Sequence, residues 1–164
     1  MLENLFHPVT MQNPERKERF EKYYYKHRCT FDVTSDIDAT PLMNYCYVTG
    51  KDFFITLLYT VSKVVNENVT YKYDVSPYMG LGYWETVHPE YTVYNEEKQL
   101  FMHVCTQYNE NFDEFYAAAK ADIEECKTGG HIAKENMPAN RFFTTYLPWR
   151  HFTGVALNTE DDYK

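Results

Sequence analysis

The chain has 164 residues and a formal net charge of −8, with 44% hydrophobic and 24% charged residues. This length and composition are typical of one globular domain, and the acidic balance argues against a broad nucleic-acid surface. The longest apolar run, residues 53–59, is too short to cross a bilayer. The first ten residues show neither the basic region nor the long apolar region of a secretory signal.

Two residue types carry further information. The 16 tyrosines and 11 phenylalanines leave two interpretations open, because such side chains either fill a core or line an apolar cleft. The cysteines form no C-x-x-C pair, which predicts reduced thiols in a cytoplasmic protein rather than a metal knuckle or a disulfide scaffold. They are Cys29, Cys46, Cys105 and Cys126.

The first half of the chain reads as helices around one strand. Asn13-Pro14 predicts a helix that runs to about His27, and its basic residues interleave with glutamates as on a solvated helix face. The alternating segment 29–38 predicts a strand. Thr40-Pro41 begins a short helix that Gly50 ends.

A third helix follows a cap at Asp52, and its apolar residues recur with the 3.6-residue period that predicts a buried face. These residues are Phe54, Leu57, Leu58, Val61, Val64 and Val65.

Strand patterns dominate the second half. They cover residues 71–75, 81–87, 91–97 and 99–108, with turns at 80–82 and 95–98. A helix capped by Asn109 runs to Gly129-Gly130, and segments 141–147 and 151–157 are further strand candidates. This order predicts one α+β domain over residues 1–164, a two-layer sandwich with helices on one face of a mostly antiparallel sheet.

Sequence motifs of common active sites are missing. The chain has no Gly-rich phosphate loop, no H-E-x-x-H and no G-x-S-x-G. Its six histidines are scattered without metal-ligand spacing. His103 and Cys105 share one face of a predicted strand, and without a third ligand a structural role is favoured over a metal or catalytic one.

Three segments carry a resemblance to a known family. "ERKERFEKYYYKHRCTFDVTSDIDAT" (15–40) spans the first predicted helix and strand. "YWETVHPEYTV" (83–93) fits the pattern Trp-x-x-Val-x-Pro-x-(Tyr/Phe)-Thr-Val, and "TYLPWRHFTGVALN" (145–158) is similar to Ser-x-x-Pro-Trp-x-x-Phe-x-x-x-x-Leu-Asn. In this order the three resemble the chloramphenicol acetyltransferase family, whose opening helix and first strand correspond to residues 15–40. The residues in register there are Arg16, Phe20, Tyr23, Cys29, Phe31 and Asp38.

The resemblance implies a cytoplasmic homotrimer that transfers acetyl from acetyl-coenzyme A to a primary hydroxyl of chloramphenicol, an activity that confers antibiotic resistance. No metal, nucleic acid or membrane takes part. In the family a histidine removes the hydroxyl proton, and a hydroxyl three residues before Pro-Trp holds the oxyanion. Thr145 occupies that position here. The residues that match the acceptor pocket are Tyr23, Cys29, Phe31, Thr92, Phe101 and Leu157.

Departures from the family pattern limit these expectations. Lys22 stands where the family can carry an aromatic residue, so the preferred acceptor stays open. Lys72 stands where the family usually has arginine, which is expected to alter a local ion pair or hydrogen-bond fork. The chain has no His-His-x-x-x-Asp-Gly motif, and Arg16 matches the arginine that pairs with the aspartate of that motif. We expect the domain to lack its C-terminal strands and helix and its catalytic base, and so to be inactive. His151 is expected to be a surface or packing residue, not a replacement base.

Two other functions stay open at this point. The first is a non-catalytic small-molecule-binding protein that retains the aromatic acceptor cleft. The second is an acetyltransferase for another hydroxyl acceptor, because family resemblance indicates reaction type more firmly than substrate.

Overall fold

The computed structural model describes residues 5–129, 137–151 and 153–154. Within these ranges no helix is long and apolar enough to span a membrane. The helices and strands follow one another in the order β1 (Phe6–Pro8), α1 (Pro14–Glu21), the π-helix η2 (Lys22–Lys26), α2 (Thr40–Thr49), α3 (Phe53–Glu67), the 3₁₀ helix η3 (Val69–Lys72), β2 (Tyr73–Ser76), β3 (Gly80–Trp84), β4 (His88–Asn95), β5 (Leu100–Cys105), α4 (Phe112–Gly129) and β6 (Arg141–Thr144).

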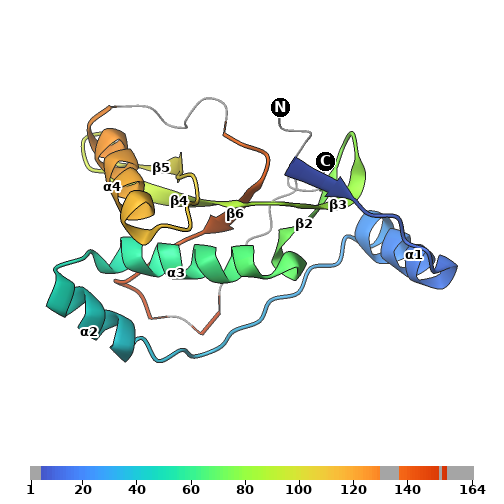
Figure 1. Ribbon diagram of the computed structural model, residues 1–164, viewed down its shortest axis with the longest axis horizontal. Helices are drawn as coiled ribbons and strands as arrows, with labels where there is room; N and C mark the ends of the chain where they lie inside the picture. The colour runs from blue at the N-terminus through green and yellow to red at the C-terminus, as the bar shows by residue number, and fades with distance from the viewer. Residues whose placement is uncertain (1–4, 130–136, 152, 155–164) are drawn as a thin grey trace.

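The strands form two three-stranded sheets with the orders β1-β3-β2 and β5-β4-β6 (Figure 1). All pairs are antiparallel except β4 with β6. Helices α3 and α4 both pack against the same face of the second sheet, because their buried residues share one cluster with the inward residues of β4 and β5. The predicted α+β fold with a mostly antiparallel sheet is therefore confirmed.

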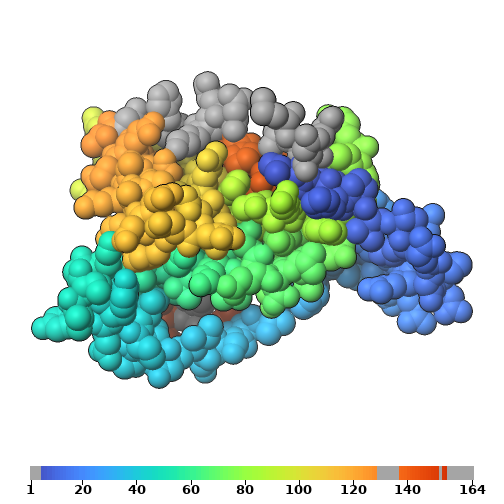
Figure 2. Space-filling view, viewed as in Figure 1, coloured from blue at the N-terminus to red at the C-terminus, as the bar shows by residue number. Residues whose placement is uncertain are grey.

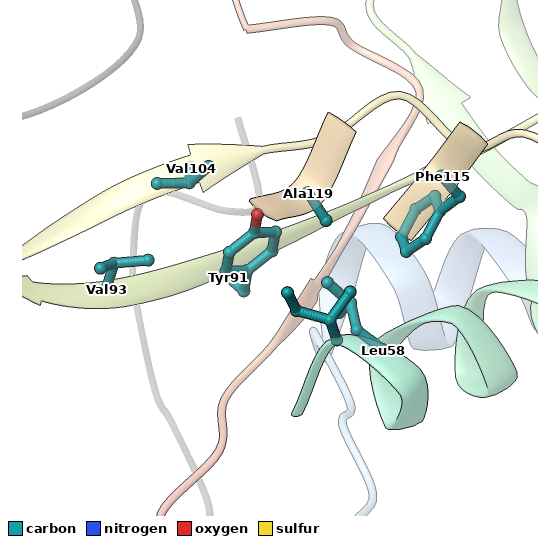
Figure 3. Packing of buried hydrophobic residues seen from close by; sticks show 7 residues of the cluster. Leu58, Tyr91, Val93, Val104, Phe115 and Ala119 are labelled. Atoms are coloured by element: carbon teal, nitrogen blue, oxygen red, sulfur yellow. The ribbon is translucent and has the colours of Figure 1, made fainter. Parts of the chain in front are cut away.

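The main core lies between the second sheet and the two helices (Figure 3). Tyr91 on β4 is fully buried at its centre. Its ring meets Phe54 of α3 edge-on with 5.5 Å between ring centroids, and its hydroxyl lies 2.8 Å from the Thr106 hydroxyl. Thr106 in turn donates to Asp122 of α4 at 2.7 Å. The remaining buried members of the cluster are Ile55, Leu58, Val93, Val104, Phe115 and Ala119.

Helix ends follow the capping residues of the sequence. The Asp52 carboxylate accepts the Ile55 backbone N–H at 2.9 Å and begins α3 as predicted. Gly50 ends α2 with a φ of 66°, a left-handed conformation that favours glycine. The predicted cap of α4 at Asn109 is wrong, because Asn111 takes this role and accepts the backbone N–H of Asp113 at 3.0 Å.

The predicted buried face of α3 is right in part, since Leu58 is buried and Phe54 and Val65 pack against the core clusters. The buried positions are Ile55, Thr56, Leu58 and Ser62, whereas Val61 and Val64 are exposed. Two polar residues occupy the inward side of the last turns of α3. Ser62 donates its hydroxyl to the Leu58 carbonyl at 2.7 Å. Asn66, one turn further, bonds both backbone groups of Val87 at 2.9 Å, so the helix docks through polar groups that a hydrophobic period ignores.

The strand predicted over residues 29–38 does not form. This segment is extended, and within the described ranges no strand pairs with it. Phe31, Val33 and Ile37 are all more than four-fifths exposed, at 88%, 81% and 86%. Alternation fits a strand only where an edge is available to pair with. The segment instead runs along the molecule from the projecting α1 and η2 toward α2 (Figures 1 and 2).

Other element boundaries differ by a few residues. The first helix ends as the π-helix η2, so α-helical geometry stops at Glu21. Residues 71–72, predicted as strand, belong to η3, where Lys72 donates to the Glu85 carbonyl at 2.9 Å. Gly82 lies inside β3 rather than in a turn. A glycine is needed there because an added Cβ would lie 2.5 Å from the His7 carbonyl oxygen. The strand candidate 151–157 lies largely outside the described residues.

One asparagine joins a turn to a helix end. Asn95 closes β4 and is buried. Its side-chain oxygen accepts the Lys98 backbone N–H at 2.9 Å, which shapes the predicted turn between β4 and β5. Its side-chain N–H groups donate to the carbonyls of Cys126 and Lys127 at 3.1 and 3.0 Å, and so satisfy the last turn of α4.

We predict that Thr106→Val destabilises the fold by about 1–3 kcal/mol, because the buried Tyr91 hydroxyl then loses its partner. Urea unfolding followed by circular dichroism measures the change. Thr106→Ser keeps the hydroxyl and is the matched control. Equal losses for both variants would show that the methyl group, rather than the hydrogen bond, matters.

We also predict an acid-dependent loss of stability through His88. Burial lowers the pKa of His88, whose Nδ1 accepts the Tyr108 backbone N–H at 3.0 Å. The unfolded chain, with a histidine pKa of about 6.5, then binds more protons than the folded one. The His88 contribution is therefore present above about pH 6.5 and is lost as the pH falls below it.

Urea midpoints between pH 8 and pH 5 test this dependence. The wild-type midpoint should fall more steeply in acid than that of His88→Gln, whereas exposed His151→Gln should follow the wild type. Parallel profiles for the wild type and His88→Gln would refute the role of His88.

Candidate functional site

A cleft of 690 Å³ opens where the second sheet, α3 and α4 meet the segment that follows β6. Its floor includes Thr92 of β4 and Phe101 of β5. Aromatic side chains from the other elements form much of its wall. They are Phe54, Tyr116, Tyr146 and Trp149.

The sheet topology explains why the cleft lies there. Strand β6 pairs only with His88–Tyr91, the first half of β4. In the described part of the chain no strand continues that edge beyond Tyr91, and the segment after β6 turns away at Pro148. Tyr146 then stacks on Phe54, with 5.3 Å between ring centroids and planes 20° apart. This pair closes the end of the cleft against α3.

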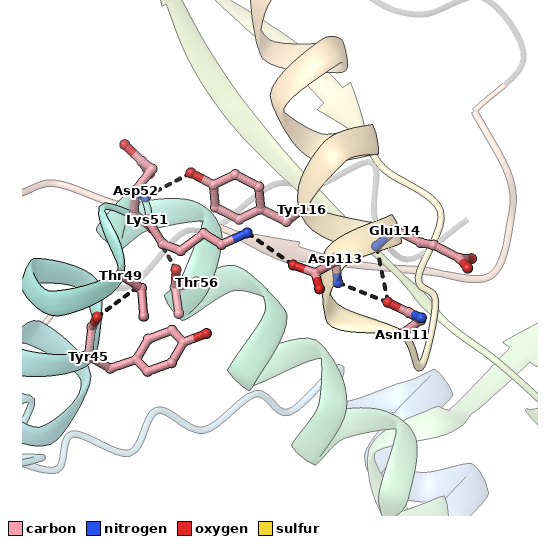
Figure 4. Close-up of polar contacts among 9 residues, drawn as sticks. All are labelled: Tyr45, Thr49, Lys51, Asp52, Thr56, Asn111, Asp113, Glu114 and Tyr116. Carbon is pink, nitrogen blue, oxygen red and sulfur yellow. Dashed lines mark hydrogen bonds and ion pairs between the residues drawn. The ribbon is translucent and has the colours of Figure 1, made fainter.

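Lys51 ties the start of α3 to α4 at the rim of the cleft (Figure 4). Its Nζ lies 3.0 Å from an Asp113 carboxylate oxygen and 4.4 Å from the centroid of the Tyr116 ring. The Asp52 backbone N–H donates to the Tyr116 hydroxyl at 2.8 Å. The bond to Asp113 raises the pKa of Lys51, so its ammonium stays charged.

Two further lysines give the cleft three lysines against two carboxylates, Asp52 and Glu124, and so a small positive charge. Lys120 and Lys127 project from α4 onto the cleft. Lys127 lies 3.3 Å from Glu124, whereas Lys120 has no ion-pair partner among residues 5–129, 137–151 and 153–154. A cleft with aromatic walls and a cationic rim fits a long ligand with an apolar part and an anionic end.

The predicted acceptor residues do not all meet in this cleft. Thr92 and Phe101 line it. Tyr23 and Cys29 instead line a separate hollow of 460 Å³ beside η2, together with Arg16. Within the described ranges no carboxylate pairs with Arg16, and its side chain is exposed.

Other predicted residues lie outside both hollows. Phe31 is 88% exposed, and Lys22 and His151 are also exposed. Thr145 directly follows β6 and is exposed, one residue before Tyr146 of the cleft wall. Leu157 lies outside the described residues. The roles assigned to these residues stay predictions.

His103 has a polar partner within the second sheet. Its Nδ1 lies 2.9 Å from Glu90, while Cys105 is buried. In the part of the chain that the structure describes, no three His, Cys, Asp or Glu residues are grouped to hold a metal.

Sequence patterns missed most of the cleft wall. Besides Glu124, the α4 side consists of Tyr116, Lys120, Ile123 and Lys127. Their spacing of four, three and four residues places them on one helix face, which is the signal that could have found them. Lys51, Phe54 and Tyr146 carry no such pattern, because three separate segments bring them together.

The family model described as chloramphenicol acetyltransferase matches residues 4–164. The chain belongs to the chloramphenicol acetyltransferase family. A Clostridium perfringens protein named chloramphenicol acetyltransferase is 32% identical over 158 residues, which cover 96% of this chain and 72% of that protein. A Bacillus pumilus protein of the same name is 33% identical over 152 residues, covering 92% of this chain and 69% of that protein.

A solved structure titled chloramphenicol acetyltransferase shares the fold. It superposes with a TM-score of 0.77 at 20% identity, and the match covers 95% of this chain and 76% of that chain. The α+β arrangement of this chain is therefore that of the chloramphenicol acetyltransferase family.

Proposed function

We propose that the chain carries the coenzyme cleft and part of the acceptor site of an O-acetyltransferase. The reaction transfers acetyl from acetyl-coenzyme A to a primary hydroxyl of chloramphenicol or a similar acceptor. Family membership over residues 4–164 is the observation that carries this proposal. The cleft beside Thr92 and Phe101 supports it, because both residues match positions of the family's acceptor pocket.

The proposed mechanism is acyl transfer through a tetrahedral intermediate. A base removes the proton of the acceptor hydroxyl, and the oxygen attacks the thioester carbonyl of acetyl-coenzyme A. The carbonyl oxygen becomes an oxyanion, which the Thr145 hydroxyl stabilises by donating a hydrogen bond. One such donor lowers the barrier by about 3 kcal/mol in known enzymes. Collapse of the intermediate releases the coenzyme thiolate and leaves the acetyl ester.

The described cleft residues include no histidine that could serve as the general base of this mechanism. The family's base stands in an adjacent histidine pair, and the six histidines of this chain include no such pair. His151 is exposed and next to Arg150, with no carboxylate to orient it among the described residues. We therefore propose that a polypeptide of these 164 residues binds ligands without turning them over. Arg16 is the proposed partner of an aspartate that accompanies the histidine pair.

Assembly and location follow from the family as proposals. We propose a cytoplasmic homotrimer with active sites between subunits, in which the hollow of Tyr23 and Cys29 completes an acceptor site. The division of the predicted acceptor residues between two hollows supports this, because neither hollow alone holds them all.

The lysines at the rim indicate how coenzyme A is oriented in the cleft. Coenzyme A ends in phosphate groups, which lysine ammonium groups attract. We propose that Lys51, Lys120 and Lys127 receive this end, while Phe54 and Tyr146 contact the apolar arm that leads to the thioester.

We predict that the 164-residue chain binds acetyl-coenzyme A and chloramphenicol but releases no thiol from the mixture. Isothermal titration measures binding, and a chromogenic thiol assay measures turnover. Turnover would contradict the absence of a base. Binding of neither compound would contradict the proposed function. Tight binding of the alcohol without any binding of acetyl-coenzyme A would favour a non-catalytic binding protein.

We predict that Lys120→Gln weakens acetyl-coenzyme A binding about two- to five-fold, because it removes one exposed charge from the rim. The loss should shrink at high salt, where such charges are screened. Lys63→Gln, on the outer side of α3 and away from the cleft, is the matched control. Equal affinities for the wild type and Lys120→Gln at low salt would refute this coenzyme orientation.

A further inference from the structure

His103 lies beside the acceptor residues on the second sheet. It pairs in register with Thr92, so the two side chains lie on the same face of adjacent strands. Phe101 lies two residues earlier on β5 and therefore on that face as well. Met102 and Val104 point to the opposite face, into the core. His103 is thus the next position along the strand from the cleft wall formed by Thr92 and Phe101.

A carboxylate holds the His103 ring in one orientation. Glu90 Oε1 lies 2.9 Å from His103 Nδ1, and Glu90 Oε2 accepts a charge-assisted bond from Arg141 Nε. Arg141 is itself anchored, because its guanidinium donates to the Pro138 carbonyl at 2.7 Å. The Glu90 side chain is only 13% exposed. A carboxylate paired with arginine accepts hydrogen bonds only, so the Nδ1–H group of His103 is the donor in this pair.

This orientation leaves the second ring nitrogen available. In the neutral ring Nε2 then carries a lone pair and accepts a hydrogen bond. No described residue bonds to it, and the side chain is 46% exposed. A pre-oriented acceptor of this kind recognises a ligand hydroxyl or amide N–H without losing rotamer freedom on binding.

The sheet register relates His103 to the proposed oxyanion residue. Thr144 pairs with Tyr91, so the following residue, Thr145, continues toward Thr92. The paired register ends there, so Thr145 lies one residue beyond the end of β6. His103 pairs with Thr92, the residue of β4 that follows Tyr91. An acceptor over Thr92 therefore lies between His103 on one side and the end of β6 on the other.

We infer that His103 is a specificity-determining residue that selects acceptors with a second hydrogen-bond donor near the reacting primary hydroxyl. This inference rests on the proposed function, since it places the acceptor over Thr92. Nε2 accepts the bond from that donor, a hydroxyl or an amide N–H, while Thr145 serves the acetyl group on the β6 side. Glu90 and Arg141 act through His103 as positioning residues.

Titration of the full chain with three compounds tests this inference. The first is chloramphenicol, which has a secondary hydroxyl and an amide N–H besides its primary hydroxyl. The other two are analogues that lack one donor each, through replacement of the secondary hydroxyl by hydrogen or methylation of the amide nitrogen. We expect the wild type to bind chloramphenicol more tightly than one of the analogues. We expect His103→Leu to lose about three- to ten-fold in chloramphenicol affinity and to abolish that preference.

Matched variants separate recognition from structure. His103→Gln retains an acceptor oxygen and should recover part of the preference, a result that a purely structural role of His103 would not give. His7→Leu, at another exposed strand histidine, should leave all three affinities unchanged. If His103→Leu does not fold, His103→Ala replaces it.

The outcomes distinguish this inference from the function on which it rests. An unchanged preference in folded His103→Leu overturns the inference and leaves the proposed acetyl transfer in place. Failure of the wild type to bind any of the three compounds counts against the proposed function itself, and the inference falls with it.

Discussion

The buried Tyr91 side chain is the contact on which the other layers depend. Its ring fills the space between β4 and the two helices, and its hydroxyl reaches Thr106, which bonds Asp122 of α4. A tyrosine in this position gives apolar area to the core and a polar end that must be satisfied. The chain therefore cannot move α4 along the sheet without breaking a buried hydrogen bond. Sheet and helix keep one register as a result.

That register also reaches the cleft. Phe54 contacts Tyr91 on its inner side and Tyr146 on its outer side. Three rings from β4, α3 and the segment after β6 thus form a continuous series of aromatic contacts, one edge-on and one stacked, from the core to the cleft wall. Aromatic side chains account for both interpretations of the composition, since some fill the core and others line the cleft. Rigid packing of this kind keeps a binding surface in place before any ligand arrives.

Local signals predicted most elements, and distant contacts account for the failures. The cap at Asp52 and the left-handed Gly50 belong to short stretches of chain, which is why α2 and α3 begin and end nearly as expected. The segment 29–38 has the alternation of a strand, but pairing depends on a partner elsewhere. The inward phase of α3 depends on Asn66 meeting Val87, 21 residues away. Glu90 and Arg141 are 51 residues apart, so no spacing pattern links them. Thr92 and Phe101 were predicted only through the resemblance to the family's acceptor pocket.

Asn95 has a consequence for how this protein can change over time. Its single amide shapes the turn after β4 and satisfies two carbonyls at the end of α4. Surface loops ordinarily tolerate insertions, because extra residues cost little in closure entropy. Here a longer loop would pull the amide away from a helix end some thirty residues later in the sequence. A change in the length of this hairpin would therefore break the hydrogen bonds that satisfy the last carbonyls of α4. The length of the hairpin and the end of α4 thus constrain each other in any variant of this sequence.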